Sequence, residues 1–260
     1  MGYVNLDSMN YWNLLWLDDY LLGHKGFICG GCFKNIMNRQ RVKDLDIFFR
    51  SEEDWHDACR YFDEQTAGFN AEGEEVSKED AAWVFNYENT KVKSYKNKKT
   101  GIVIELCRTV FGEPKDVLDK FDFTIAKFAY YKEEVEDETG AEVTPFDDSY
   151  DNVSQDLKDL VDLCIYTKEE AIAEHKKAKA ETHYETRIIC HENFFEHLHM
   201  NRLVIDDQIL FPMSTLERMF RYVSYGFKPC KETKLKIARA LSQVPEETIE
   251  TSESFYDGMD

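Results

Sequence analysis

The sequence contains no long hydrophobic run. No stretch approaches the roughly 18 consecutive apolar residues of a membrane-spanning helix. No N-terminal segment combines a basic start, an apolar run and a small-residue cleavage site. We therefore expect no membrane partner and a cytoplasmic protein.

The cysteines do not have the pattern of a disulfide framework. Their number, seven, is odd, and they are scattered along the 260 residues. This usage fits a reducing compartment, which again favours the cytoplasm.

Basic residues are scarce. The 32 Lys and Arg residues are outnumbered by 51 Asp and Glu residues, which gives a formal net charge of −19. Such a surface repels phosphodiester backbones, because proteins that bind long nucleic acids normally carry basic patches. We expect no binding to duplex DNA. Small nucleotides with bound magnesium, or a protein acceptor, fit this charge better, and elsewhere the acidity serves solubility.

The chain has ample material for a packed core. Hydrophobic residues make up 43% of it and aromatic residues 14%, so it is not a disordered protein. Its length allows one large domain, or one domain with a smaller helical appendage.

Periodicity and turn residues predict the secondary structure. Helices are expected at 10–22, 32–38, 52–64, 114–120, 123–131, 156–184, 192–198, 215–225 and 231–241. Strands are expected at 26–29, 42–49, 82–88, 92–95, 101–108 and 203–205. Ser214, with Glu217 three residues later, has the capping-box pattern of a helix start.

Two adjacent glycines and two alternating aspartates form the central motif. Gly30-Gly31 is separated by 12 residues from Asp44-x-Asp46. Glycines at a strand-to-helix turn allow a phosphate to approach the backbone. Carboxylates at alternating positions of a strand lie on one face, and burying such a pair is costly unless cations neutralise it. Mg²⁺ is the natural cation, although D-x-D alone also occurs on the solvent face of edge strands.

The segment FICGGCFKNIMNRQRVKDLDIFF resembles the head domain of the DNA polymerase β superfamily of nucleotidyltransferases. The most similar branch is that of bacterial poly(A) polymerases and CCA-adding enzymes, and small phage-type nucleotidyltransferases are similar in outline. Three further segments resemble this family in the same order. They are IVIELCR, which contains Glu105, FDFTIAKFAYY, which begins at Phe121-Asp122, and LERMFRYVSYGF, which contains Arg218 and Arg221.

The resemblance implies an α+β fold, with a small mixed β-sheet flanked by helices and a helical C-terminal appendage that closes the nucleotide site. The head would span residues 1–131 and the appendage 156–244. Between them we place an acidic insertion at 132–155, and after them a disordered acidic tail at 245–260.

The implied activity is the transfer of a nucleoside monophosphate from an NTP to an acceptor hydroxyl, with release of pyrophosphate. Asp44, Asp46 and Glu105 would be catalytic and would hold two Mg²⁺ ions. Gly30, Gly31 and Lys34 would hold the phosphates. Asp122, Arg218 and Arg221 would orient the sugar and the base.

The sequence departs from the family pattern at several positions. Lys34 replaces the family arginine, Lys120 and Phe121 replace paired arginines, and Ser214-Thr215 replaces the Glu-Asp pair used in base recognition. No long basic tRNA-binding tail follows. We therefore favour a compact acceptor, either a protein hydroxyl or a small molecule. If a tRNA 3′ end is the acceptor instead, the basic segments Lys176–Lys179 and Lys231–Arg239 must bind its backbone.

Two other functions stay open. The chain could be a nucleotide-binding pseudoenzyme, which the altered positions favour. It could also be a zinc-stabilised adaptor, in which Cys29 and Cys32 act with a second group of possible ligands. That group consists of Cys190, His191, His197 and His199. The two last histidines are more simply core or surface residues, or contact the substrate.

Overall fold

The computed structural model describes residues 2–66, 81–134, 158, 161, 167–172, 184–205 and 209–245. The chain forms two compact units. One consists of Met1–Lys132 with Thr186–Asp260, and the other of Glu133–Glu185. In the described part of the second unit, a short helix at 168–172 begins with a reciprocal cap. The Thr167 N–H donates to Glu170 Oε2 at 2.8 Å, and the Glu170 N–H donates to Thr167 Oγ1 at 3.2 Å.

An eight-stranded sheet is the centre of the first unit, in the order β1-β8-β7-β2-β3-β6-β5-β4. The strands are β1 (Tyr3–Leu6), β2 (Phe27–Cys29), β3 (Asp44–Phe49), β4 (Trp83–Glu88), β5 (Val92–Asn97), β6 (Val103–Phe111), β7 (Phe128–Glu134) and β8 (Tyr184–His191). β3 and β6 are parallel, whereas β2–β3, β2–β7, β4–β5 and β5–β6 are antiparallel. This mixed sheet confirms the α+β fold class.

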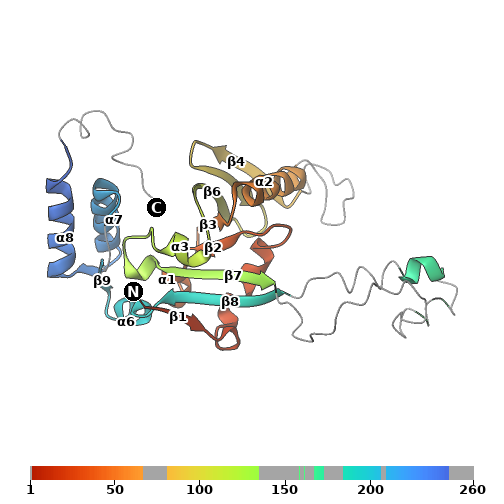
Figure 1. Ribbon diagram of the computed structural model, residues 1–260, viewed down its shortest axis with the longest axis horizontal. Coiled ribbons are helices and arrows are strands. Elements are labelled where there is room, and N and C mark those ends of the chain that lie inside the picture. Colours follow the sequence, from red (N-terminus) through yellow and green to blue (C-terminus); the bar gives the residue numbers. More distant parts are fainter. Residues whose placement is uncertain are drawn as a thin grey trace. The chain divides into compact units, whose positions relative to one another are not determined.

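The helices are η1 (Ser8–Asn10), η2 (Trp12–Tyr20), α1 (Cys32–Met37), α2 (Glu52–Thr66), α3 (Pro114–Leu118), η3 (Thr124–Ala126), α6 (Phe194–His199), α7 (Pro212–Ser224) and α8 (Lys231–Ser242). The η elements are 3-10 helices. β9 (Arg202–Leu203) and β10 (Lys228–Pro229) form a separate parallel pair. In Figure 1, α7 and α8 lie side by side, as do β7 and β8. Among the described residues, no helix has the length and apolar character that a membrane span requires.

Three local predictions are wrong. Residues 123–131 form η3 and then strand β7, not a helix. A short apolar run such as this one can form a helix or a strand, and its pairing with β2 and β8 stabilises the strand. The opening helix is a 3-10 helix. Ser214 does not cap α7, because the helix begins at Pro212, whose missing N–H suits the first helical position, and Ser214 is buried inside the first turn.

The sheet is larger than expected because the sequence does not predict β1 and β8. β8 comes from residues after the insertion, within the range assigned to the appendage, and pairs with β1 at the edge of the sheet. Most of the helix predicted at 156–184, and the tail from 246, lie outside the described residues.

The two faces of the sheet are covered by different apolar groups. Leu45 and Ile47 of β3 belong to the larger core, together with residues of η2, α2 and α6. Phe27, Cys29 and Cys107 belong to a smaller core with Val117 and Leu118 of α3. Because strand residues alternate between faces, Asp44 and Asp46 of β3 project on the side of this smaller core.

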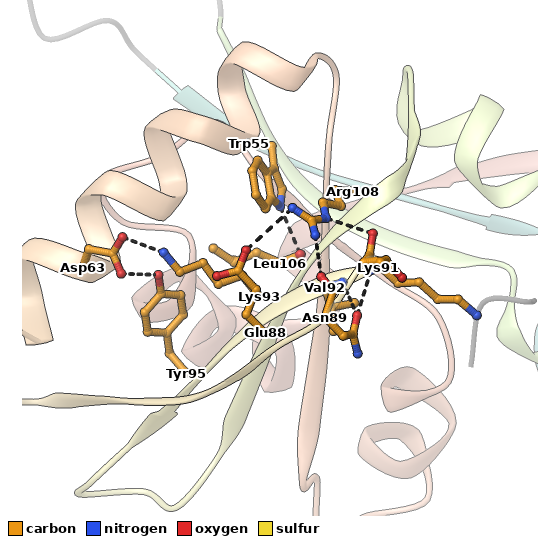
Figure 2. Close-up of polar contacts among 11 residues, drawn as sticks. Trp55, Asp63, Glu88, Asn89, Lys91, Val92, Lys93, Tyr95, Leu106 and Arg108 are labelled. Carbon is orange, nitrogen blue, oxygen red and sulfur yellow. Dashed lines mark hydrogen bonds and ion pairs between the residues drawn. The ribbon is translucent and has the colours of Figure 1, made fainter.

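A polar network fixes α2 on the opposite face of β5 and β6 (Figure 2). The Trp55 indole donates to the Leu106 carbonyl at 3.0 Å, and the Arg108 guanidinium lies 5.3 Å from the indole ring centre. Asp63 accepts from Lys93 Nζ at 2.6 Å and from the buried Tyr95 hydroxyl at 2.7 Å. These contacts hold β6, which carries Glu105, in place.

Candidate active site

Three carboxylates gather on one face of neighbouring strands. Asp46 and Glu105 are direct Cα partners in the parallel pair of β3 and β6, and Asp44 lies two residues before Asp46 on the same face. Asp44 is exposed, whereas Asp46 and Glu105 are partly buried. Like charges this close favour a cation beside them.

The row of partners extends across five strands. Cys29, Asp46, Glu105, Ser94 and Tyr87 are successive cross-strand partners on β2, β3, β6, β5 and β4. The Tyr87 hydroxyl donates a hydrogen bond to Glu105 Oε1, and it reaches over the small, buried Ser94 to do so. Burial and the nearby Glu105 carboxylate raise the pKa of Tyr87, so that its hydroxyl stays a donor. The sequence alone does not reveal Tyr87, because its proximity to Glu105 depends on pairing across β5.

The carboxylates fit magnesium by their chemistry, because Mg²⁺ takes oxygen ligands. In the described arrangement, however, no group of three His, Cys, Asp or Glu side chains among the described residues is close enough to hold a metal ion. A shared ion therefore requires the carboxylates to turn toward one another, and Glu105 is the one that Tyr87 holds.

The double glycine brings the backbone close to Asp46. Gly30 has φ +102°, a conformation that glycine adopts without cost, and an added Cβ would lie 3.4 Å from Asp46 Oδ2. An added Cβ on Gly31 would lie 3.3 Å from the Tyr222 hydroxyl. The glycine turn thus runs between the Asp46 carboxylate of β3 and the Tyr222 hydroxyl of α7.

Lys34 is held against α7. It is buried, donates from Nζ to Asn35 Oδ1 at 2.8 Å, and places Nζ 5.6 Å and 5.2 Å from the ring centres of Tyr222 and Tyr225. Burial lowers the pKa of Lys34, while Cys32 and Asp44 act in the opposite direction. Its ammonium group is thus partly desolvated, close to both the glycine turn and Asp44.

Asp122 and Arg218 bind each other. Arg218 donates from Nε at 2.9 Å and from Nη2 at 2.8 Å, both to Asp122 Oδ2, and the Phe123 N–H donates to Asp122 Oδ1 at 2.9 Å. Both side chains are buried, so this ion pair joins α7 to the segment before η3. Arg221, three residues further along α7, is exposed.

Tyr222 is a second residue of the site that the sequence motifs do not single out. It is buried, packs edge-on against Phe123 with ring centres 5.5 Å apart, and lies over both Gly31 and Lys34. Burial, with Asp122 as a further cause, raises its pKa. A signal is present in the sequence, because Tyr222 is four residues after Arg218 and therefore on the same face of α7.

The cysteines near the carboxylates are neutral thiols. Burial raises the pKa of Cys29, Cys32 and Cys107 well above the usual value, and Asp46 raises each one further. Because the thiolate is the form that binds zinc, a zinc ion at these cysteines would have to displace their protons.

The remaining candidate zinc ligands do not assemble with them. His197 is buried and its Nδ1 is hydrogen-bonded to Thr124 Oγ1 at 2.8 Å, whereas His199 is exposed. Burial raises the pKa of the Cys190 thiol to about 12. The part of the chain that the structure describes contains no group of three such side chains suited to a metal, so the geometry does not support a zinc adaptor.

Comparisons with known proteins give one family. The sequence model described as Gabija anti-defense 2 family protein (Gad2) matches residues 6–201. None of the curated proteins matches this sequence.

Solved structures of CCA-adding enzymes are similar at low sequence identity. The Thermotoga maritima CCA-adding enzyme complexed with tRNA is 12% identical, with a TM-score of 0.48 over 100% of this chain and 52% of that one. A complex of a CCA-adding enzyme with CTP is 12% identical, with a TM-score of 0.46 over 98% of this chain and 50% of that one. The chain thus spans about half the length of these structures.

Proposed function

The chain belongs to the Gabija anti-defense 2 family, and we propose that it acts against the Gabija defence as a magnesium-dependent nucleotidyltransferase. The observation that carries this proposal is the position of three carboxylates, Asp44, Asp46 and Glu105, on neighbouring strands beside the Gly30-Gly31 turn. The ordered sequence resemblance to the nucleotidyltransferase superfamily, which includes these residues, also supports it.

The proposed reaction joins an acceptor oxygen to the α-phosphorus of an NTP. The bond between the α-phosphorus and the oxygen that joins it to the β-phosphorus breaks, pyrophosphate leaves with that oxygen, and the acceptor hydroxyl releases its proton to solvent. Two magnesium ions bound by Asp44, Asp46 and Glu105 would supply the charge that activates the hydroxyl and neutralises the pyrophosphate.

The other residues have roles in binding. The Gly31 N–H and the Lys34 ammonium hold the β- and γ-phosphates, and Gly30, whose own N–H donates to the Phe128 carbonyl at 3.1 Å, lets the phosphates approach the backbone closely. Asp122, Arg218 and Arg221 orient the sugar and the base. The buried contact between Asp122 and Arg218 supports a role in which the pair fixes α7 over the nucleotide.

The acceptor we favour is compact, and the family name directs the proposal to a hydroxyl on a protein of the Gabija defence. The net charge of −19 supports a protein over a long nucleic acid. The alternative acceptor is a tRNA 3′ end.

The test offers each of four α-labelled NTPs with magnesium to the purified chain. Purified Gabija proteins and tRNA are supplied as acceptors in separate reactions. The proposal predicts magnesium-dependent labelling of a Gabija protein. Labelling of tRNA alone would contradict the proposed acceptor but not the proposed reaction. If neither acceptor were labelled with any NTP, the proposed reaction would be contradicted.

A nucleotide-binding pseudoenzyme is the second candidate. The hydrogen bond from Tyr87 to Glu105 favours it, because it engages a carboxylate needed for metal binding. Calorimetry with a non-hydrolysable NTP and magnesium distinguishes the two functions. Tight binding, combined with no transfer to any acceptor, supports the pseudoenzyme.

A further inference from the structure

A cleft of about 950 Å³ lies between η2, the end of α1 and the turn that joins β5 to β6. Its walls include Trp12 and Trp16 from η2, Arg39 and Arg41 from the segment after α1, and Thr100 from the turn. The volume is in the range of small-molecule sites. None of the residues proposed for NTP binding or catalysis lines it, so it is a separate site.

One wall of the cleft is aromatic. Trp12 leaves 76% of its surface exposed, which is a large apolar area to leave in water. Trp16 packs edge-on against Tyr20 at 5.7 Å, and the Tyr20 hydroxyl is 2.9 Å from Thr100 Oγ1. Trp16 is therefore held in place, while the exposed indole of Trp12 is accessible to a flat ligand that stacks on it.

The opposite wall is basic. Arg39 and Arg41 are exposed, and neither is ion-paired with another described residue. No Asp or Glu of the described chain lines the cleft, although the whole chain has a net charge of −19. Two guanidinium groups without acidic neighbours favour an anion, and a phosphate fits their planar donor geometry.

The backbone of Arg39 gives independent support. It has φ +55°, a left-handed conformation that is unfavourable for residues other than glycine. Arg39 follows Asn38, the C-cap of α1, at the position where glycine most often ends a helix, and its N–H donates to the Ile36 carbonyl at 3.0 Å. Glycine would fit this position better, so the presence of arginine here is consistent with a use for its side chain.

We propose that this cleft binds a mononucleotide, at a second site distinct from the NTP site. The base stacks on Trp12 and Trp16, and the phosphate binds between Arg39 and Arg41. Asn13 and Gln40, which also line the cleft, have side-chain amides that can hydrogen-bond polar atoms of the ligand. A free nucleotide fits better than a nucleic-acid strand, because the net charge of −19 on the whole chain repels the further phosphates of a strand.

The indole N–H signals of the four tryptophans provide the test, since Trp12 and Trp16 line the cleft and Trp55 and Trp83 do not. The ¹⁵N-labelled chain is titrated with 5′-AMP, GMP, CMP and UMP in EDTA, which suppresses metal-dependent NTP binding. We expect saturable shifts of the Trp12 and Trp16 signals with at least one nucleotide, and weaker binding of its nucleoside and of inorganic phosphate. No saturable shift with any of the four would overturn the proposal.

Variants test the basic wall. Arg39→Gly removes the guanidinium and relieves the backbone strain, so it should fold at least as well while weakening nucleotide binding about tenfold. Arg41→Gln should weaken binding similarly, whereas Arg60→Gln, with the same loss of charge at an exposed position of α2, should not. Wild-type affinity of both cleft variants would refute the site. Tighter binding of a single-stranded tetranucleotide than of any mononucleotide would refute the choice of a free nucleotide.

Discussion

At the scale of single residues, Tyr87 controls the position of the Glu105 side chain. Its hydroxyl donates to Glu105 across Ser94, and this bond must break if Glu105 is to bind a metal ion with Asp44 and Asp46. The contact is possible because serine is short, so the two long side chains on either side of it can meet.

Tyr87→Phe should therefore lower the magnesium concentration that half-saturates NTP binding. We expect a decrease of about threefold or more, because a hydrogen bond to a charged group no longer competes with the metal. Magnesium titration monitored by NTP binding measures it. Tyr184→Phe, at an exposed tyrosine of β8, serves as the control and should change nothing. An increase in the magnesium requirement of Tyr87→Phe would show that the tyrosine instead supports the metal site.

His24 links the stability of the fold to pH. Its Nε2 is 3.0 Å from the Tyr20 carbonyl, and its Nδ1 accepts from the Gly26 N–H at 3.0 Å, an arrangement that requires the neutral ring. Burial lowers the pKa of His24 to about 4. The ring lies near Phe49, Tyr61 and Phe62, which shield part of it from water.

The free energy of unfolding should therefore fall as the pH decreases from about 6.5 to 4, because in that window the unfolded chain binds a proton that the folded chain does not. The loss attributable to His24 reaches about 3 kcal/mol at most. Urea unfolding of His24→Asn between pH 7 and 4 measures it, with exposed His199→Asn as control. If the free energy of unfolding of His24→Asn fell with decreasing pH as steeply as that of the wild type, His24 would not be the group responsible.

At the scale of elements, the ion pair of Asp122 and Arg218 fixes α7 to the head. Removing one partner of a buried pair leaves a charge without its neutralising partner, which typically costs about 3–5 kcal/mol. Asp122→Asn should therefore lower the unfolding temperature and weaken NTP binding together. The double variant Asp122→Asn with Arg218→Met should recover part of the stability but not the binding. A loss of stability in the double variant equal to the sum of the losses in Asp122→Asn and Arg218→Met alone would show that the two residues act independently.

The elements that the sequence predicts correctly have signals in their own residues. α2 and α8 are periodic, β6 is rich in β-branched residues, and the alternation around Leu45 and Ile47 predicts the face on which Asp44 and Asp46 lie. β7 has no such signal. Its residues Phe128, Ala129 and Tyr130 are all buried, so no alternation distinguishes the strand from a buried helix.

The parts of the site that the sequence does not predict depend on partners far along the chain. The order of the family-like segments predicts Glu105 as a site residue, and the register of β3 and β6 places it opposite Asp46. The contact of Tyr87 depends on two further strand pairings, and that of Tyr222 on the packing of α7. β8 lies beyond the acidic segment at which the head is expected to end, so its pairing has no local signal.

At the scale of the whole molecule, charge governs the choice of acceptor. α8 contains the predicted basic segment Lys231–Arg239, whereas Lys176–Lys179 lies outside the described residues. Transfer to a protein hydroxyl does not require many phosphates to be bound, so it should change less than about threefold between 50 and 200 mM salt. A strand held by six or more phosphate contacts would lose about a thousandfold in affinity over the same range. Labelling of a Gabija protein and of tRNA at both salt concentrations measures the difference, and salt-resistant labelling of tRNA would contradict this account.

The most direct test of the proposed chemistry compares NTPs labelled on the α- and on the γ-phosphate, with the wild-type chain and with Asp44→Asn and Asp46→Asn. Transfer of a nucleoside monophosphate predicts acceptor labelling from the α-position only. Each aspartate variant should lose about 100-fold or more of the rate and keep its unfolding temperature, since carboxylate repulsion is relieved. Asp57→Asn, at an exposed position of α2, should retain full activity. Labelling from the γ-position, or wild-type turnover in either aspartate variant, would contradict the assignment.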